Sequence, residues 1–163
     1  MKPEEGTVMT TERASGVMPA ERPSGVSGLR LAPGLAGRPE FIIQQYLAAL
    51  ASGDLALMRG LFTAEAVVNS PLYGRMPAEA FYAQLFARTS KSSLQLKDMY
   101  NSITRPDEWI GYFTYEWTLA GGELFTFDVC DLFRFDLPRG QITEVTIIYD
   151  TAGAPAKARA VAP

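Results

Sequence analysis

Two kinds of hydrophobic periodicity meet near Ser92, and their order limits the possible folds more than any other feature of the sequence. Before this point, apolar residues recur at the three- to four-residue spacing of amphipathic helices. After it, apolar and polar residues alternate in four segments, at 93–104, 109–119, 123–135 and 142–150, as they do in half-buried strands. Helices followed by a run of strands predict an α+β domain with an antiparallel sheet.

Three helices are predicted ahead of these strands. The first begins near Pro39 and ends before Gly53, because proline suits the first helical turn and glycine the residue after the last. Asp54 can cap a short second helix, and Pro77 opens a third, after a strand and turn at 66–74. The inward stripes are Ile43, Tyr46, Leu47 and Leu50; Leu57, Met58, Leu61 and Phe62; and Phe81, Tyr82, Leu85 and Phe86.

Composition places one folded domain in the middle of the chain. Residues 1–38 and 152–163 are rich in small residues and proline, so we expect a disordered leader and a flexible tail around a domain at 39–151. The net charge is −3, without a dense Lys/Arg cluster, which argues against a nucleic-acid partner. No apolar run suits a signal peptide or a membrane span, and one cysteine fits a cytoplasmic protein.

The absence of histidine narrows the chemistry. Ser-His-Asp and Cys-His nucleophiles, His-ligated zinc and His-ligated haem all need an imidazole. The sequence also offers no metal-ligand set and no phosphate-binding glycine loop. We therefore expect no metal or other cofactor, and any proton transfer falls to carboxylate, tyrosine or lysine side chains.

One carboxylate interrupts an otherwise apolar strand face. Because side chains alternate along a strand, Asp131 shares its face with Phe125, Phe127, Val129, Phe133 and Phe135. An ionised carboxylate is unstable among such neighbours, so Asp131 is expected to stay protonated and to donate a hydrogen bond. A structural bond to a buried arginine or a backbone amide fits the same pattern.

Several segments together resemble ketosteroid isomerases and their SnoaL-like polyketide cyclase relatives, which share a cone-shaped fold with nuclear transport factor two. The segments are QQYLAALASGDLALMRGLF, AVVNSP with the following YG, EAFYAQLF, FDVCDLFRFD and TEVTIIYD. The resemblance implies a curved antiparallel sheet and three N-terminal helices that cover a pocket. It also implies a hydrophobic small-molecule substrate and a homodimer, although this fold hosts many reactions.

Position by position, the resemblance implies roles for four residues. Tyr46 matches the tyrosine, and Asp131 the neutral acid, that bind the enolate oxygen in such isomerases. Tyr82 matches a tyrosine that supports the first one by a hydrogen bond. The usual aspartate base before the turn proline is replaced by Ser70, which cannot take a proton from carbon without an activator. Ser70 is expected to donate a hydrogen bond, to place a water or to serve only the turn.

Glu116 is the candidate replacement for this base. A two-residue Gly121-Gly122 turn predicts a hairpin that puts Glu116 on the Asp131 face. The expected substrate-binding residues are Tyr82, Thr114, Thr118, Phe127, Val129 and Tyr149. The opposite face, which a second copy would cover, then consists of Phe113, Tyr115, Trp117 and Leu119. A one-residue slip would exchange the two faces.

The sequence therefore predicts a cofactor-independent cyclase or isomerase of polyketide-like natural-product biosynthesis. Tyr46 and protonated Asp131 would polarise a substrate carbonyl, because donors aimed at its oxygen stabilise developing charge. Two alternatives stay open. One is an epoxide hydrolase or epoxide-opening cyclase, with Asp131 as acid and Glu116 or a Ser70-held water on the nucleophile side. The other is a non-catalytic ligand-binding or dimerisation module.

Overall fold

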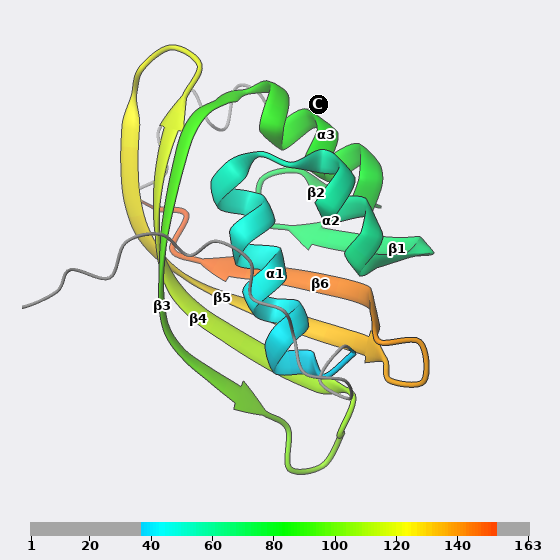
Figure 1. The fold of residues 1–163 in the computed structure, drawn as a ribbon. Coiled ribbons are helices and arrows are strands. Elements are labelled where there is room, and N and C mark those ends of the chain that lie inside the picture. The colour runs from blue at the N-terminus through cyan, green and yellow to red at the C-terminus, as the bar shows by residue number, and fades with distance from the viewer. Residues whose placement is uncertain (1–36, 153–163) are drawn as a thin grey trace, which may run out of the picture. The chain divides into compact units, whose positions relative to one another are not determined.

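The computed structural model describes residues 37–152, so nearly all of the predicted leader and tail, 1–36 and 153–163, lies outside the described residues. Within this range the chain forms helices and strands in the order α1 (Pro39–Ser52), α2 (Leu55–Leu61), β1 (Phe62–Ser70), β2 (Gly74–Pro77), α3 (Ala78–Ala87), β3 (Thr89–Asn101), β4 (Glu108–Leu119), β5 (Leu124–Asp136) and β6 (Gln141–Tyr149) (Figure 1).

The helices begin where their capping chemistry predicts, and α1 also ends at its predicted position. Gly53 follows α1 in the left-handed region, with φ of 66°, and its conformation is one that a side chain disfavours. Asp54 caps α2 by accepting the Leu57 N–H at 2.9 Å. Phe62, predicted for the second helix, instead opens β1. No helix in residues 37–152 is long and apolar enough to cross a membrane.

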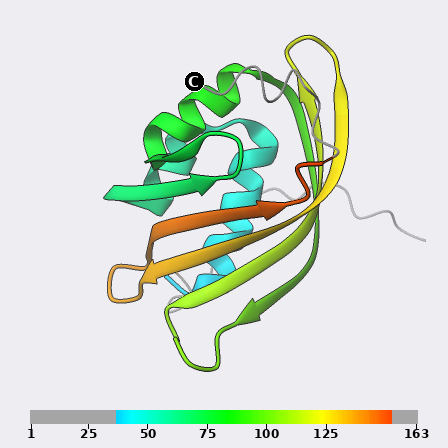
Figure 2. The same cartoon turned by 180° about the vertical axis from the view of Figure 1, so that it is seen from behind.

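The six strands of residues 37–152 form one curved sheet in the order β2-β1-β6-β5-β4-β3, and the helices cover its inner face (Figures 1 and 2). This confirms the predicted α+β fold. Neighbouring strands are antiparallel except β1 and β6, which run parallel, with Val68 opposite Val145. The sequence did not predict this pair, because a pairing between strands far apart in the chain leaves no turn signal. It also did not predict the short strand β2, which pairs with β1 directly after the turn at 71–73.

A glycine lets α1 lie close to the sheet. Gly111 on β4 pairs with Asp131 on β5. A Cβ atom at Gly111 would come within 3.2 Å of Ile43 on α1 and 3.3 Å of Phe133 on β5. Both neighbours are fully buried. The missing side chain at this position therefore brings α1 close to the strand pair that carries Asp131.

The predicted register of the β4–β5 hairpin is wrong by one residue. Thr118 pairs with Leu124, and Glu116 pairs with Thr126 instead of Phe127. The connection is longer than two residues, and the Leu119 N–H donates to the Glu123 carbonyl at its base. The slip turns Glu116 onto the outer face, where it is exposed, and Thr114 and Thr118 point the same way.

The aromatic row of β4 consequently faces the helices. Tyr115 and Trp117 are 8% and 6% exposed, so they belong to the core and do not form the aromatic outer face that was predicted to bind a second copy. Polar contacts occupy part of the outer face instead, where Asp128 accepts from Lys97 at 2.7 Å and from Thr114 at 2.8 Å. The homodimer stays a prediction without this support.

Candidate functional site

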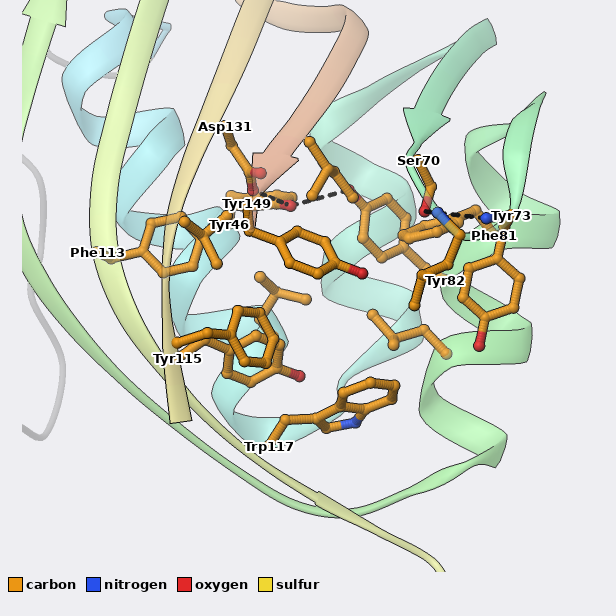
Figure 3. Close-up of a pocket in the computed structure, with 16 residues that line it drawn as sticks. Tyr46, Ser70, Tyr73, Phe81, Tyr82, Phe113, Tyr115, Trp117, Asp131 and Tyr149 are labelled. Atoms are coloured by element: carbon orange, nitrogen blue, oxygen red, sulfur yellow. Dashed lines mark hydrogen bonds between the residues drawn. The ribbon is translucent and has the colours of Figure 1, made fainter. Parts of the chain in front are cut away.

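A cavity lies between the helices and the inner face of the sheet (Figure 3). Its empty volume is about 500 Å³ including the open mouth. Seven of the ten residues predicted for the site line it: Tyr46, Ser70, Tyr82, Phe127, Val129, Asp131 and Tyr149. Glu116, Thr114 and Thr118 do not, since the register shift turns them outward. Asp131 is thus the one carboxylate among the described residues that line the cavity.

A chain of hydrogen bonds from three elements ends at Asp131. Tyr82 on α3 donates to Tyr46 on α1 over 3.0 Å between the two phenol oxygens. Tyr46 donates to Oδ2 of Asp131 on β5 over 2.8 Å. All three side chains are at most 2% exposed. The sequence predicts two donors that converge on a substrate oxygen, whereas the structure arranges Tyr46 and Asp131 in series.

The second carboxyl oxygen of Asp131, Oδ1, makes no hydrogen bond within the described residues. Among residues 37–152, Oδ1 is the buried side-chain oxygen or nitrogen that has no hydrogen-bond partner. Burial raises the pKa of Asp131 to about 7, and the hydrogen bond from Tyr46 lowers it by a smaller amount. Because Oδ2 accepts from Tyr46, a proton on Asp131 belongs on Oδ1. The protonated acid can then donate to a molecule in the cavity.

Tyr46 and Tyr82, the two tyrosines of this hydrogen-bond chain, keep their protons. Burial, followed by the nearby Asp131 charge, raises the pKa of both Tyr46 and Tyr82 well above the ordinary value. Tyr46 therefore acts as a neutral donor that stabilises Asp131 when this residue ionises. Tyr82 supplies Tyr46 with a donor of its own and fixes the direction in which the Tyr46 proton points.

Ser70 ends β1 and takes part in the turn that follows. Its Oγ accepts the N–H groups of Leu72 and Tyr73, each at 3.3 Å, and the residue is 9% exposed. Asn69 points to the outer face, where its amide donates to Glu144 at 2.7 Å and to Thr146 at 3.0 Å. The turn role predicted for Ser70 and a place at the cavity wall are thus combined in one residue.

Three side chains form a row across the inner sheet face. Asp131 on β5 lies opposite Ile147 on β6. Asn69 on β1 lies opposite Thr146, so Ser70 is the neighbour of Ile147 on the other side. All three residues of this row line the cavity. Because adjacent strands are about 4.8 Å apart, the backbones at Ser70 and Asp131 are roughly 10 Å apart.

Tyr115 and Trp117, which were predicted for the outer face, form aromatic walls of the cavity. Trp117 donates from its indole N–H to Thr89 at 2.8 Å, and Tyr115 shares a hydrogen bond of 2.9 Å with Ser92. These bonds hold the polar ends of both rings away from the ligand space and leave the ring faces to it. The alternation of Phe113, Tyr115 and Trp117 indicates one shared face, but the predicted hairpin register put that face outside. The observed register, shifted by one residue, turns it toward the cavity.

Metal binding finds no support among the described residues. In residues 37–152, no three cysteine or acidic side chains come close enough together to hold a metal ion. The chemistry that this site can offer is hydrogen-bond donation and proton exchange at Asp131, within largely aromatic walls.

The comparisons with known proteins agree with this architecture. A family model described as a SnoaL-like domain matches residues 43–145. A ketosteroid isomerase-like protein from Catenulispora acidiphila, solved with trimethylamine, has a TM-score of 0.62 and 18% identity over 74% of this chain and 92% of its own. TerC, co-crystallized with polyporic acid, has a TM-score of 0.57 and 18% identity over 69% and 92%. An NTF2-like protein from Cytophaga hutchinsonii has a TM-score of 0.56 and 13% identity over 69% and 90%.

These identities establish a common fold and nothing finer. No match was found among the curated proteins.

Proposed function

This chain belongs to the SnoaL-like family, within the NTF2-like and ketosteroid isomerase-like superfamily, and we propose that it is a cofactor-independent cyclase or isomerase acting on a small carbonyl compound of polyketide type. One observation carries the proposal: Oδ1 of Asp131 is a buried carboxyl oxygen without a hydrogen-bond partner among residues 37–152, on a residue that lines the cavity. A buried polar atom of this kind costs free energy unless a ligand satisfies it.

In the proposed reaction, protonated Asp131 donates from Oδ1 to the substrate carbonyl oxygen. A carbon nucleophile of the same molecule, such as an enol carbon, attacks the carbonyl carbon and forms a C–C bond. The π electrons of the carbonyl group move onto its oxygen, which takes the proton from Asp131 and becomes a hydroxyl group. The proton that the enol oxygen releases then returns to the Asp131 carboxylate. Closure within one bound molecule needs no strong base, because the cavity supplies the folded conformation.

Tyr46 and Tyr82 support this proton exchange through the other carboxyl oxygen of Asp131, Oδ2. When Asp131 gives up its proton, the hydrogen bond from Tyr46 to Oδ2 stabilises the new carboxylate. Tyr46 is thus a positioning residue in this scheme. Ser70 takes no proton, in agreement with the turn bonds of its oxygen.

Calorimetric binding of 1-tetralone, a stable cyclic ketone, tests the proposal. A ketone that accepts from protonated Asp131 should bind several-fold more weakly at pH 8.5 than at pH 5.5, because Asp131 ionises near pH 7. The Asp131→Asn variant should bind with little pH dependence. Equal affinity at both pH values in the unmodified protein would contradict the proposed role of Asp131.

A second candidate function is the binding of a small amine. A tertiary ammonium ion would pair with ionised Asp131 and lie against the aromatic walls through cation–π contacts. The trimethylamine complex of the Catenulispora acidiphila protein favours testing this ligand. Trimethylammonium binding should strengthen from pH 5.5 to pH 8.5, which is the opposite trend to that of 1-tetralone, so one pair of titrations separates the two candidates.

The epoxide-opening alternative loses its Glu116 nucleophile, since this residue is on the outer face. A polyketide-like natural product as substrate, a homodimer and a cytoplasmic location stay predictions.

A further inference from the structure

Two further polar side chains reach the cavity: Tyr149 from a position beside Asp131, and Ser70 from the opposite side (Figure 3). Asn69 and Thr146 are paired in the parallel β1–β6 ladder, so Ser70 and Tyr149 end neighbouring strands with an offset of two residues, roughly 7 Å. Both residues line the cavity. Together their side chains form a second polar edge of the cavity. Ser70 on β1 is two strands away from Asp131 on β5, and Tyr149 on β6 is one strand away.

The hydroxyl proton of Ser70 is available at this edge. Its oxygen already accepts the two N–H groups of the turn at 3.3 Å, and within residues 37–152 it donates no hydrogen bond. The residue is 9% exposed, so bulk water satisfies it poorly. Ser70 is therefore prepared to donate rather than to accept.

The phenol of Tyr149 is the second donor. Its ring packs on Phe127, with centroids 4.9 Å apart, and its hydroxyl has no hydrogen bond within the described residues. Burial, and secondarily the nearby Tyr73, raises the pKa of Tyr149 to about 12. Tyr149 keeps its proton at neutral pH, so it can serve as a donor to a ligand oxygen.

We propose that Ser70 and Tyr149 bind a second oxygen of the substrate, so that the ligand is a ketone with another oxygen at the opposite edge of its carbon skeleton. The inference rests on the proposed function, because the first oxygen is the carbonyl at Asp131. Ile147 lies between the two polar positions and contacts the apolar body of the ligand. The substrate class is thus a hydroxyketone or diketone rather than a simple ketone.

Matched ligands test this proposal by calorimetry at pH 5.5. 1-Tetralone carries one oxygen, and its 4-hydroxy and 6-hydroxy derivatives place a second oxygen at two distances from the carbonyl. At least one derivative should bind about tenfold more tightly than 1-tetralone, the effect of one or two good hydrogen bonds. Tyr149→Phe and Ser70→Ala should each remove most of this advantage, so that the ratio between the affinity of the derivative and the affinity of 1-tetralone falls toward one.

Two controls keep the result specific. Ser70→Thr retains the hydroxyl and should retain the preference, which separates donation from the turn role of the oxygen. Tyr100→Phe removes a phenol that is 52% exposed and does not line the cavity, and should change nothing.

The outcomes distinguish the two proposals. If 1-tetralone binds with the expected Asp131 dependence but neither derivative gains from Ser70 or Tyr149, the second polar edge is wrong and the proposed function stands. If a derivative binds more tightly through Ser70 or Tyr149 but no ligand depends on Asp131, the proposed function is wrong and the second polar edge stands. If none of the three ligands binds, both proposals are contradicted.

Discussion

Tyr46 donates a hydrogen bond of 2.8 Å to Asp131 from a helix 85 positions earlier in the chain. The bond joins α1 to the centre of the sheet and takes one oxygen of the only carboxylate that, in the described part of the chain, lines the cavity. It leaves the other oxygen for a ligand.

Tyr46→Phe should raise the pKa of Asp131 above about 7, because the hydrogen bond that lowers this pKa is lost while burial remains. The pH at which 1-tetralone binding weakens should rise by the same amount. Calorimetric titrations from pH 5 to pH 9 measure this midpoint. A midpoint that stays in place or falls would show that the Tyr46 bond does not stabilise the carboxylate.

Asp131→Asn should change how stability depends on pH. The folded-state pKa of Asp131 is raised from 3.8 to about 7, so the native protein holds an extra proton between these values and loses stability as pH rises through them. A pKa rise of about 3 corresponds to at most about 4 kcal/mol. The unfolding free energy of the unmodified protein should therefore fall relative to the variant between pH 4 and pH 8 in urea titrations. Parallel curves for the two proteins would contradict the raised pKa.

Ser70→Asp should add a base to the cavity. An aspartate keeps an oxygen for the Leu72 and Tyr73 N–H groups but supplies a carboxylate that accepts a proton from carbon. The probe is 3-cyclohexenone, in which a base removes a proton next to the carbonyl and the proton returns at the far end of the alkene. The variant should form conjugated enone at least about tenfold faster than the unmodified protein, followed by ultraviolet absorbance. The double variant Ser70→Asp/Asp131→Asn should lose this gain if Asp131 binds the carbonyl. A Ser70→Asp rate equal to that of the unmodified protein contradicts the prediction.

Gly111→Ala should destabilise the fold by about 1–3 kcal/mol, because the new methyl group overlaps the tight contacts with Ile43 and Phe133. It should also weaken the contact between α1 and the Asp131 strand pair, and so shift the pH midpoint of 1-tetralone binding upward. Gly121→Ala is the matched control, since nothing lies within 4 Å of its added Cβ. Urea denaturation of both variants checks the difference. Equal stability would mean that α1 can move away from the sheet without cost.

Local signals in the sequence were sufficient for the helices and for the burial of Asp131. Pro39, Gly53 and Asp54 mark helix ends through backbone chemistry that does not depend on the rest of the fold. The inward position of Asp131 follows from alternation within one strand, which the apolar neighbours make unambiguous. Its raised pKa follows from the same burial.

Relations between distant segments could not be predicted in the same way. Glu116 was misplaced because a one-residue change in a hairpin connection reverses every side chain beyond it, and the strand has plausible residues on both faces. The parallel β1–β6 pair, which brings Ser70 and Tyr149 together, joins segments about 75 residues apart without a turn between them. Whether Tyr46 points at Asp131 or at a ligand depends on side-chain geometry that spacing alone does not contain.

Strand β4 gives neighbouring residues separate tasks. Phe113, Tyr115 and Trp117 form cavity walls, while the alternate residues Thr114, Glu116 and Thr118 lie on the other side of the sheet. Substitutions in the first set alter what the hollow accepts, and those in the second alter charge and solubility. Selection can therefore change ligand preference and surface character independently, although both are encoded in the same short stretch of chain.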